Sequence, residues 1–489
     1  MGEEFADLAT RVLAGARWFA GKGRPLRVVR VIPLPWTWRT DDAASSSHPA
    51  PAGATRGGQA GHTRGSLVGV RPVLVTVAHD DVRPVATDTY QFLLAVHRPG
   101  DATPPGAYGA CRDAPVTGSA DLCPVADATR DPEAMARVLA AFGAPAEHRP
   151  SAAGAVHHHL VVPLPDADLT PRPFTGEQSN SSVFYGHALV LKVFRRLEIG
   201  HNLDIAVHEA LGREGTGGIA VLYGWAEARW DDGTDVLSAD LAMLTERFRE
   251  ARDGWELALE ACAAGADFST EAQALGRTLR AIHEGLARRF PTEVVDGGSV
   301  AATMTRRLAD ATAAVPALQP YAPALQKVFA GLEGRPLEAQ HVHGDFHLGQ
   351  VLGTPEGWRV IDFEGEPLKS LPERWAPDSP WRDVAGMLRS FDYAAASVAR
   401  AAEGPDRAAT TAWRQRCRTG FLSGYLHGLP TAPDLAVLRA YESDKAVYEV
   451  VYEARNRPDW LDIPLGAVAD LAAPSPDPSG GQSPNREEK

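Results

Sequence analysis

The hydrophobic pattern of the chain changes once, near residue 250, and this change restricts the fold more than any other feature. Before it, short apolar runs dominate, as in Ala188–Phe194 and Asp240–Phe248. After it, apolar residues recur at three- and four-residue steps, as in Leu279, Ile282 and Leu286. Short apolar runs indicate strands, whereas the longer recurrence indicates helices. The sequence therefore predicts an α+β fold in which a β-rich part precedes a mainly helical part.

A further β-rich unit is expected at the N-terminus. A helix is predicted at Phe5–Ala16, and strand-like runs lie at 67–78 and 90–97. Two segments, 41–66 and 98–130, are rich in small and polar residues and show no periodicity. That composition is typical of long, disordered insertions.

These patterns divide the chain into four parts. The N-terminal unit covers 1–155, the next β-rich lobe covers 156–248, and the helical lobe covers 249–470. Residues 471–489 are rich in Pro, Ser and Gly and cannot bury a core, so they are expected to form a disordered tail. A length of 489 residues also favours two or three folded domains.

Composition excludes several classes of protein. The net charge of -13 argues against a nucleic-acid-binding protein, which would present a concentrated basic face. No run of about 18 apolar residues is present, so no membrane span is expected. The first residues are acidic, where a signal peptide would be basic and then apolar. A cytoplasmic location is the resulting prediction.

The cysteines agree with that location. Cys111, Cys123, Cys262 and Cys417 are sparse and scattered, which favours reduced thiols. Cys111 and Cys123 lie in one loop-like segment, so a disulfide between them remains an alternative.

The stretch with the clearest chemical meaning runs from His341 to Val351 and reads His-Val-His-Gly-Asp-Phe-His-Leu-Gly-Gln-Val. An apolar strand is expected to end at Asp345, an amide follows at Gln350, and a second apolar strand leads to Asp362. In phosphoryl transfer one carboxylate accepts the proton of the attacking hydroxyl, while an amide and another carboxylate hold magnesium on the nucleotide phosphates. We therefore expect Asp345 to be the general base, with Gln350 and Asp362 as magnesium ligands.

Neighbouring polar residues allow more than one interpretation. His347 is expected to project toward the same site and to touch the acceptor. His343 is explained equally well as a buried structural histidine. Glu364 and Glu366 follow the second aspartate closely and are interpreted as solvated acids rather than as metal ligands.

The nucleotide half of such a site requires a lysine held by a carboxylate from a neighbouring helix. Lys192 lies in the middle of an apolar strand, and Glu209 follows 17 residues later in the helix-forming segment 203–211. We expect these two residues to form the phosphate-gripping pair. A lysine on the solvated face of a strand is the alternative.

A polar turn precedes that strand and spans 175–183. Its backbone amides, with Ser179, Ser181 and Ser182, are expected to cap the terminal phosphate of ATP. An ordinary hairpin explains any single one of these residues equally well.

The segment 242–248 leads from the last strand of the β-rich lobe into the helical lobe. Glu246 and Phe248 lie where the backbone of such a connection would meet an adenine ring. They are therefore predicted to contribute to the nucleotide site.

Several motifs together resemble the actinobacterial maltokinases. The segments that carry the resemblance are 17–24, 343–350, 361–367, 388–393 and 445–460. They spread over nearly the whole chain apart from its loops and tail. The insertions 41–66 and 98–130 depart from the pattern because they are longer than the fold requires.

The resemblance implies a bilobal fold like that of aminoglycoside and protein kinases, with an extra cap domain on the ATP lobe. It implies ATP- and Mg²⁺-dependent conversion of maltose to maltose 1-phosphate, which feeds α-glucan synthesis in cooperation with trehalose synthase. It assigns Asp345 as base, Gln350 and Asp362 as metal ligands, and Lys192 with Glu209 as the phosphate-gripping pair.

The C-terminal helical segment offers a face that suits a sugar. At about 100° per residue, one side carries Lys445, Glu449, Tyr452 and Asn456. The opposite side carries Val447, Val450, Val451 and Ala454. Hydrogen-bonding groups beside an aromatic ring are what a carbohydrate site needs, whereas a solvated amphipathic face is the alternative.

Two other functions remain open. A kinase of the same fold would act on glucosamine, another hexose or an aminoglycoside through a similar nucleotide half. The balanced charges of Lys445 and Glu449 favour a neutral disaccharide. A catalytically silent kinase fold is the second alternative, but such proteins usually lose one of the lysine, base or metal-ligand positions that are present here.

Residues 17–24 read Arg-Trp-Phe-Ala-Gly-Lys-Gly-Arg and also have two interpretations. Trp18 and Phe19 are expected to anchor the N-terminal unit, because burying aromatic rings contributes more than exposed charges do. The alternative is a basic surface around Lys22 that touches phosphate or a partner enzyme.

Overall fold

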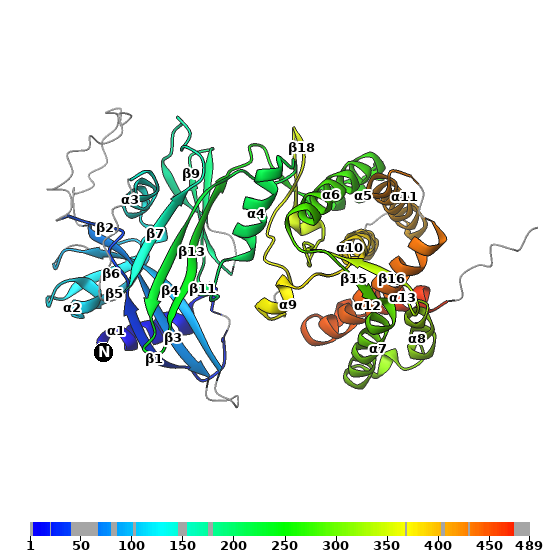
Figure 1. Cartoon of the computed structure of the whole chain (residues 1–489), viewed down its shortest axis with the longest axis horizontal. Helices are drawn as coiled ribbons and strands as arrows, with labels where there is room; N and C mark the ends of the chain where they lie inside the picture. Colours follow the sequence, from blue (N-terminus) through cyan, green and yellow to red (C-terminus); the bar gives the residue numbers. More distant parts are fainter. Residues whose placement is uncertain are drawn as a thin grey trace, which may run out of the picture. The chain divides into compact units, whose positions relative to one another are not determined.

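The computed structural model describes residues 3–19, 21–40, 67–79, 86–100, 104–144, 154–174, 179–366, 369–401, 406–428 and 431–473. The chain forms two compact units. Unit 1 consists of Met1–Arg213 and Ala220–Glu250, and unit 2 consists of Glu214–Ile219 and Ala251–Lys489. Unit 1 is rich in strands and unit 2 is mainly helical (Figure 1), which confirms the predicted α+β class.

The first sheet of unit 1 is antiparallel and is covered on one face by a helix. Its main strands, in spatial order, are β1 (Arg27–Pro33), β3 (Leu67–His79), β4 (Ala86–His97), β6 (Cys123–Asp127) and β5 (Ala107–Cys111), with β2 (Trp38–Arg39) on β3 and β11 (Arg196–Leu197) on β4. Helix α1 (Glu3–Gly15) packs against β1 and β5. The predicted helix at Phe5–Ala16 is thus confirmed.

The segment 98–130, expected to be a disordered insertion, is largely ordered. Residues 104–130 contain β5, the short helix α2 (Ala114–Thr117), β6 and the 3-10 turn η2 (Ala128–Arg130). Cys111, Val116 and Val125 are buried in the core, so the segment contributes apolar surface that its polar composition concealed. Residues 41–66 and the tail from residue 474 lie outside the described residues.

The second sheet of unit 1 is also antiparallel. Its order is β7 (Ala155–Leu160), β12 (Leu222–Asp231), β13 (Val236–Glu246), β10 (Leu189–Val193), β9 (Ser181–Tyr185) and β8 (Pro171–Pro173). Helix α4 (Leu203–Glu214) follows the strand pair β9–β10 in the chain. In register, Lys192 of β10 lies opposite Ser182 of β9 and Met243 of β13.

One hydrophobic core joins the two sheets of unit 1. Val70 and Leu74 of the first sheet belong to the same buried cluster as Leu189 and Leu191 of the second. Helix α3 (Pro132–Gly143) contributes Met135, Val138, Leu139 and Phe142 to this cluster. The predicted domain boundary at residue 155 therefore falls inside a unit whose two sheets bury their surface together.

Unit 2 contains most of the helices among the described residues. These are α5 (Gly254–Ala263), α6 (Ser269–Arg289), α7 (Gly297–Ala314), α8 (Ala322–Ala330), α9 (Leu371–Trp375), α10 (Trp381–Arg400), α11 (Arg407–Leu426), α12 (Ala432–Asn456) and α13 (Asp462–Ala472). Helices α6 and α11 approach closely because of glycines. A Cβ atom on Gly276 would lie 2.2 Å from the Phe421 carbonyl oxygen, and one on Gly424 would lie 2.0 Å from that of Gln273.

Two small sheets complete unit 2. One contains β14 (Arg252–Asp253), β17 (Val351–Thr354) and β18 (Gly357–Val360), and the other pairs β15 (Glu293–Asp296) with β16 (Pro336–Ala339). The strand expected to end at Asp345 instead ends at Ala339. The backbone N–H groups of His343 and Gly344 donate to the Asp383 side chain rather than to a strand, which explains the difference.

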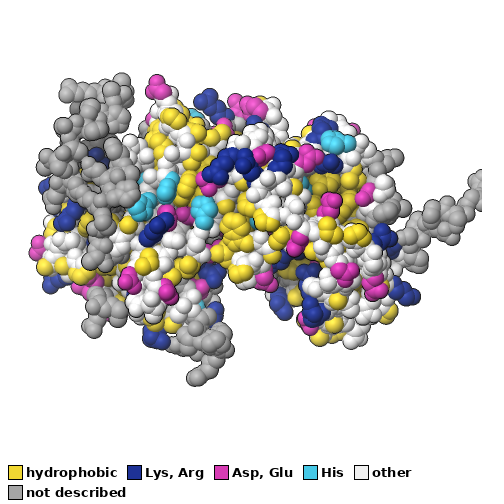
Figure 2. Space-filling view, in the orientation of Figure 1, with side chains coloured by type: hydrophobic (Ala, Val, Ile, Leu, Met, Phe, Trp, Pro, Cys, Tyr) yellow, Lys and Arg dark blue, Asp and Glu magenta, His cyan; other side chains and the backbone are white. Residues whose placement is uncertain are grey.

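Figure 2 shows both basic and acidic side chains on the described surface of the face drawn. Among the residues that the structure describes, no helix is both long and apolar enough to cross a membrane.

Candidate active site

A buried aspartate on α10 shapes the loop that carries the predicted base. Asp383 accepts hydrogen bonds from the backbone nitrogen atoms of His343 at 2.7 Å and Gly344 at 2.8 Å. Gly344 has a φ of +83°, which favours glycine at this turn. The carboxylate of one helix therefore fixes the backbone directly before Asp345.

Asp383 is itself held by a histidine of α6. His283 Nε2 lies 2.9 Å from Asp383 Oδ2, and His283 Nδ1 lies 2.9 Å from the Tyr425 hydroxyl oxygen. Burial opposes ionisation of Asp383, but the hydrogen bond and charge of His283 and the N–H donors of the loop together lower its pKa. The loop thus rests on a buried carboxylate that stays charged.

Asp345 lies between a cation and a histidine. Its Oδ1 atom is 3.4 Å from Lys445 Nζ on α12, and its Oδ2 atom is 3.9 Å from His347 Nε2. Burial, more than any neighbouring charge, lowers the pKa of His347. His347 Nδ1 accepts a hydrogen bond from the Gly349 backbone nitrogen at 3.0 Å, so its Nε2 is the atom that faces the carboxylate.

The two predicted metal ligands lie close together. Gln350 Nε2 is 3.4 Å from Asp362 Oδ2, and the Ile361 backbone nitrogen donates to the Gln350 carbonyl at 3.0 Å. His343 Nε2 is 3.0 Å from the Ile361 carbonyl oxygen, which links the loop of the base to this segment. The two residues that the sequence assigned to one metal site therefore lie in contact in the structure.

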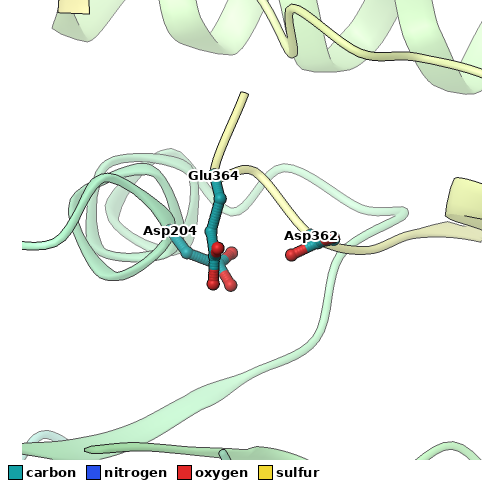
Figure 3. Close-up of side chains that lie close together, drawn as sticks. All are labelled: Asp204, Asp362 and Glu364. Carbon is teal, nitrogen blue, oxygen red and sulfur yellow. The ribbon is translucent and has the colours of Figure 1, made fainter. Parts of the chain in front are cut away.

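Asp362 has a strained backbone. Its φ is +66°, a conformation that non-glycine residues rarely adopt and that often marks functional positions. Its carboxylate oxygen lies within 4.8 Å of that of Glu364, and Figure 3 shows both side chains on the segment after β18. Carboxylate and amide oxygens are hard ligands that suit Mg²⁺, so Asp362, Glu364 and Gln350 fit such an ion. Glu364 was interpreted from sequence as merely solvated.

A cavity of about 290 Å³ opens beside Asp345, and all of its lining residues belong to unit 2. Polar groups come from Asp345, Glu366, Arg382, Arg307, Asp444 and Lys445, and rings come from Tyr441 and Tyr448. Burial raises the pKa of Tyr448 to about 12, so its hydroxyl keeps its proton at neutral pH. A pocket with an aromatic wall and convergent polar groups beside a carboxylate suits a small polar ligand.

Ion pairs neutralise most of the charge in this cavity. Arg382 pairs with Glu366, and Arg307 Nη2 lies 2.9 Å from Asp444 Oδ2. Lys445 pairs with Asp345. Three of the carboxylates that border the cavity, those of Asp345, Glu366 and Asp444, are therefore matched by cations from unit 2 itself.

The sugar-reading face predicted on α12 differs from the face that borders the cavity. Lys445 lines the cavity, but Glu449 is buried and accepts two hydrogen bonds from Arg389 of α10, at 2.9 and 2.7 Å. Tyr452 and Asn456 are exposed and absent from the lining. Helix α10 covers the polar side of α12 with a buried arginine, so α12 presents Asp444, Tyr448 and Val451 to the cavity instead.

The lysine pair also differs from the prediction. Lys192 Nζ lies 3.1 Å from Asp204 Oδ2 at the start of α4. Glu209, five residues further along α4, contacts His201 and Arg213 instead. Asp204, visible on α4 in Figure 3, is therefore the helix carboxylate that holds Lys192. Both residues come from unit 1.

The turn predicted to cap the phosphate is only partly within the described residues, because Thr175–Gln178 lie outside them. Ser179 is exposed, whereas Ser181 and Ser182 are half-buried in β9. Ser181 Oγ accepts a hydrogen bond from Arg195 Nε at 2.8 Å, which ties this strand to the chain after β10.

Glu246 is the last residue of β13, and Phe248 follows two residues later, shortly before the chain leaves unit 1. The Glu246 backbone nitrogen donates to the Val221 carbonyl at 2.9 Å, and its Oε2 atom accepts from the Val221 nitrogen at 3.3 Å. The contribution of Glu246 and Phe248 to a nucleotide site remains a prediction.

Sequence reasoning missed Asp383 and Arg382. It interpreted Glu366 as a solvated acid, whereas Glu366 is buried and paired with Arg382. Asp383 lies 38 residues from Asp345 and carries no local motif of its own. The sequence did contain a signal for Asp383. The segment 381–400 is amphipathic and has this aspartate near its start, and a carboxylate that is buried on a helix needs a polar partner.

The fold and the loop that carries Asp345 indicate a phosphotransferase. Comparison with protein families supports the same class. The model of the phosphotransferase enzyme family (APH) matches residues 171–417, just over half of the chain. The chain therefore belongs to the phosphotransferase enzyme family. This membership confirms the predicted kinase-like fold and the broader part of the predicted resemblance.

Two curated relatives are similar to the chain. The glucosamine kinase of Streptacidiphilus jiangxiensis is 28% identical over 354 residues, covering 64% of this chain and 80% of that protein. The glucosamine kinase of Mycolicibacterium smegmatis is 28% identical over 334 residues, covering 61% and 79%.

Solved structures share the fold. A glucosamine kinase in complex with glucosamine, ADP and inorganic phosphate has a TM-score of 0.61 and 21% identity, and the match covers 96% of this chain and all of that one. A second glucosamine kinase structure has a TM-score of 0.53 and 25% identity, covering 69% and 86%. The first match includes the β-rich N-terminal region as well as the helical part.

Proposed function

We propose that this phosphotransferase is an ATP-dependent sugar kinase with Asp345 as its general base. The observation that carries the proposal is the placement of Asp345 at a cavity with an aromatic wall and matched charges. A sugar hydroxyl at Asp345 would give its proton to the carboxylate while its oxygen attacks the γ-phosphorus of ATP. ADP then leaves, and the sugar phosphate is released.

The other predicted residues have supporting roles in this reaction. Lys192, held by Asp204, binds the nucleotide phosphates, with Ser179, Ser181 and Ser182 beside them. Gln350 and Asp362, with Glu364, supply oxygen ligands for Mg²⁺, which when bound neutralises charge on the phosphates. Lys445 orients the Asp345 carboxylate. His347 stays neutral, and because its Nδ1 already accepts from Gly349, its Nε2 carries the proton and donates a hydrogen bond.

We infer maltose as the acceptor, phosphorylated at its anomeric hydroxyl to give maltose 1-phosphate. The sequence motifs support this choice, and so do the ion pairs of the cavity. Glu366, Asp444 and Asp345 each have a cationic partner within unit 2, so little negative charge is left to attract a cationic sugar. The product would feed α-glucan synthesis in the cytoplasm, with trehalose synthase as a candidate partner.

Glucosamine is the second candidate acceptor. It is favoured by the two relatives that are named glucosamine kinases. An ammonium group would need a carboxylate that is not fully neutralised, and Asp310 at the cavity is exposed. Maltose is neutral and suits a cavity whose carboxylates are paired, whereas glucosamine carries an ammonium group and needs a carboxylate that is not fully neutralised.

A panel of acceptors distinguishes the candidates. The full chain is incubated with Mg²⁺-ATP and maltose, glucosamine, glucose or kanamycin, and the product is identified by ³¹P and ¹H NMR. Maltose 1-phosphate as the main product supports the first choice, whereas a higher kcat/KM for glucosamine overturns it. No transfer to any sugar would contradict the kinase proposal itself.

The assigned base is tested separately. Asp345→Asn removes the proton acceptor and keeps the size of the side chain. Loss of a positioned general base should lower kcat by on the order of 10²–10⁴. Activity within tenfold of the unmodified protein would show that another group takes the proton.

A further inference from the structure

Cys111 and Cys123 are two thiols of unit 1 that the proposed reaction does not use. Cys111 ends β5, Cys123 begins β6, and the register of this antiparallel pair places them directly opposite each other. Both belong to the hydrophobic cluster that includes Phe5 of α1, so both side chains leave the sheet on the same face. Both are free thiols in this structure.

This placement satisfies the distance requirement of a disulfide. Directly opposite residues of antiparallel strands have Cα atoms about 4.5 or 5.5 Å apart, and a disulfide needs about 4.4–6.8 Å. Their Cβ atoms lie about 4.5–5.5 Å apart, against about 3.5–4.5 Å in a disulfide. The strand pair must therefore close slightly. The register of β5 is irregular between Ala107 and Gly109, and such irregularities locally disrupt the ladder of a strand pair.

We propose that Cys111 and Cys123 form a reversible intrachain disulfide by exchange with a small-molecule disulfide. One protein thiolate attacks a sulfur of the small disulfide, which yields a mixed disulfide and releases one small thiolate. The second protein thiol loses its proton, attacks the protein sulfur of the mixed disulfide and releases the second small thiolate. Two protein thiols are oxidised and one small disulfide is reduced, so electrons and protons balance.

The exchange is expected to be slow in the folded protein. Burial raises the pKa of the Cys111 thiol to about 11, although the Asp113 backbone nitrogen donates a hydrogen bond to its sulfur at 3.3 Å. Little thiolate is present at neutral pH, and the thiolate is the attacking species. The loop between the two strands is at the surface, where Leu122 is 43% exposed, so local opening at this end admits the reagent.

The bond would restrain a strand that supports the nucleotide side of unit 1. β6 continues into Asp127 and Thr129, whose side chains bind Arg195 Nη2 at 2.5 and 3.1 Å. Arg195 Nε in turn donates to Ser181. A cross-link at the start of β6 limits the freedom of the unfolded chain, so the oxidised protein should melt at a higher temperature.

The test uses the full chain and requires no kinase activity, so its outcome is independent of the proposed function. Reduced protein is incubated with oxidised glutathione at about pH 8.5, then denatured, alkylated, digested and mapped by mass spectrometry. We expect a peptide that links positions 111 and 123, with a mass lower by two hydrogen atoms. Cys262 and Cys417, which are also buried, should be alkylated.

Matched variants separate this pair from cysteine oxidation in general. Cys123→Ser should lose both the link and the difference in melting temperature between oxidised and reduced protein. Cys262→Ser removes a similarly buried thiol and should keep both. Full alkylation at positions 111 and 123 of the unmodified protein, or a link through Cys262 or Cys417, overturns the proposal. The mapping of the unmodified chain decides the question even where a variant fails to fold.

Discussion

Arg195 and Asp127 form a buried ion pair in unit 1, with Arg195 Nη2 2.5 Å from Asp127 Oδ2. The arginine follows β10, the strand of Lys192, and the aspartate ends β6 of the first sheet. Arg195 also donates to Ser181 Oγ and lies over the Trp18 ring at 5.1 Å. One side chain thus connects the N-terminal sheet with the strands that carry the predicted phosphate-binding residues.

Replacing this arginine should destabilise unit 1. Arg195→Met leaves Asp127 buried without its cation, which typically costs about 3–5 kcal/mol. The free energy of unfolding, measured with urea at neutral pH, should therefore fall by about that amount. The double variant Arg195→Met with Asp127→Asn should recover part of the loss, because it removes the uncompensated charge.

The cost of Arg195→Met should also depend on pH. Burial opposes ionisation of Asp127, but the charge of Arg195 and the hydrogen bonds from Arg195 and Thr129 lower its pKa below the ordinary value of 3.8. The stabilisation is therefore complete above that ordinary value and is lost as pH falls through the folded pKa. Unfolding measurements should show the unmodified protein and the variant converging in acid, and a constant difference would contradict this account.

Asp383 is expected to act as a positioning residue for Asp345. In Asp383→Asn, only one side-chain oxygen remains for the two N–H groups of His343 and Gly344, and the amide nitrogen meets a donor. Displacement of a catalytic group by about 1 Å costs on the order of 10² in rate, so kcat should fall by that order while the KM for ATP changes little.

Steady-state kinetics with a melting curve test the role of Asp383. Asp470→Asn, an exposed change on α13, serves as the matched control and should leave kcat and the melting temperature unchanged. A kcat effect that disappears once the unfolded fraction is subtracted would assign Asp383 to stability alone.

Residues tied by short-range spacing were predictable, and residues joined by tertiary packing were not. The contact between Gln350 and Asp362 could be predicted because a few residues separate each from Asp345 or from a strand end, and their role as metal ligands stays a prediction. Asp383 was missed because its hydrogen bonds to the loop span about 40 positions.

The two corrections on helices have a common cause. A helical wheel groups Lys445 with Glu449, but it does not say that α10 places Arg389 against Glu449. Likewise α4 offers both Asp204 and Glu209, and only the packed structure selects the one at the helix start for Lys192. Periodicity gives the angular grouping of side chains, whereas the neighbouring elements decide which side is covered.

Lys445 should be required for efficient transfer because it contacts the base. A hydrogen bond to a charged group is worth about 1.5–3 kcal/mol, so Lys445→Met should lower kcat/KM for the acceptor by roughly ten- to a hundredfold. Lys445→Arg keeps the positive charge and should recover part of the loss. Lys327→Met, an exposed change on α8, is the control, and an equal effect of both Met variants would refute a specific role.

His201 should make the stability of unit 1 depend on pH near neutrality. A hydrogen bond to Asp240, at 2.8 Å, is the main cause that raises the pKa of His201 above its usual 6.5, and Glu209 adds to it. A raised folded pKa means that the stabilisation is complete below the unfolded pKa and is lost as pH rises through the folded value. The melting temperature should therefore fall as the pH rises above about 6.5, the ordinary pKa of histidine.

The variant His201→Gln checks that assignment. It keeps a hydrogen-bonding side chain without a titrating group, so its melting temperature should vary less with pH in that range. His187→Gln removes an exposed histidine from the turn after β9 and should retain the full dependence. Equal pH profiles for the unmodified protein and His201→Gln would place the dependence elsewhere.

Trp18 should anchor the N-terminal unit, whereas Lys22 should not. The Trp18 ring lies 6.0 Å from that of Tyr90 and 5.8 Å from that of Phe92, and Phe19 beside it is buried. Complete loss of a buried aromatic side chain costs about 3–5 kcal/mol, and half-buried Trp18 should therefore cost somewhat less.

Lys22 is exposed, so Lys22→Ala should change the melting temperature very little, while Trp18→Ala should lower it by several degrees. Calorimetric titration with Mg²⁺-ATP completes the comparison, because both variants should bind the nucleotide as the unmodified protein does once folded. Weaker ATP binding in Lys22→Ala, together with an unchanged melting temperature in Trp18→Ala, would reverse the assignment. Residues 17–24 would then belong to the nucleotide site rather than to the core.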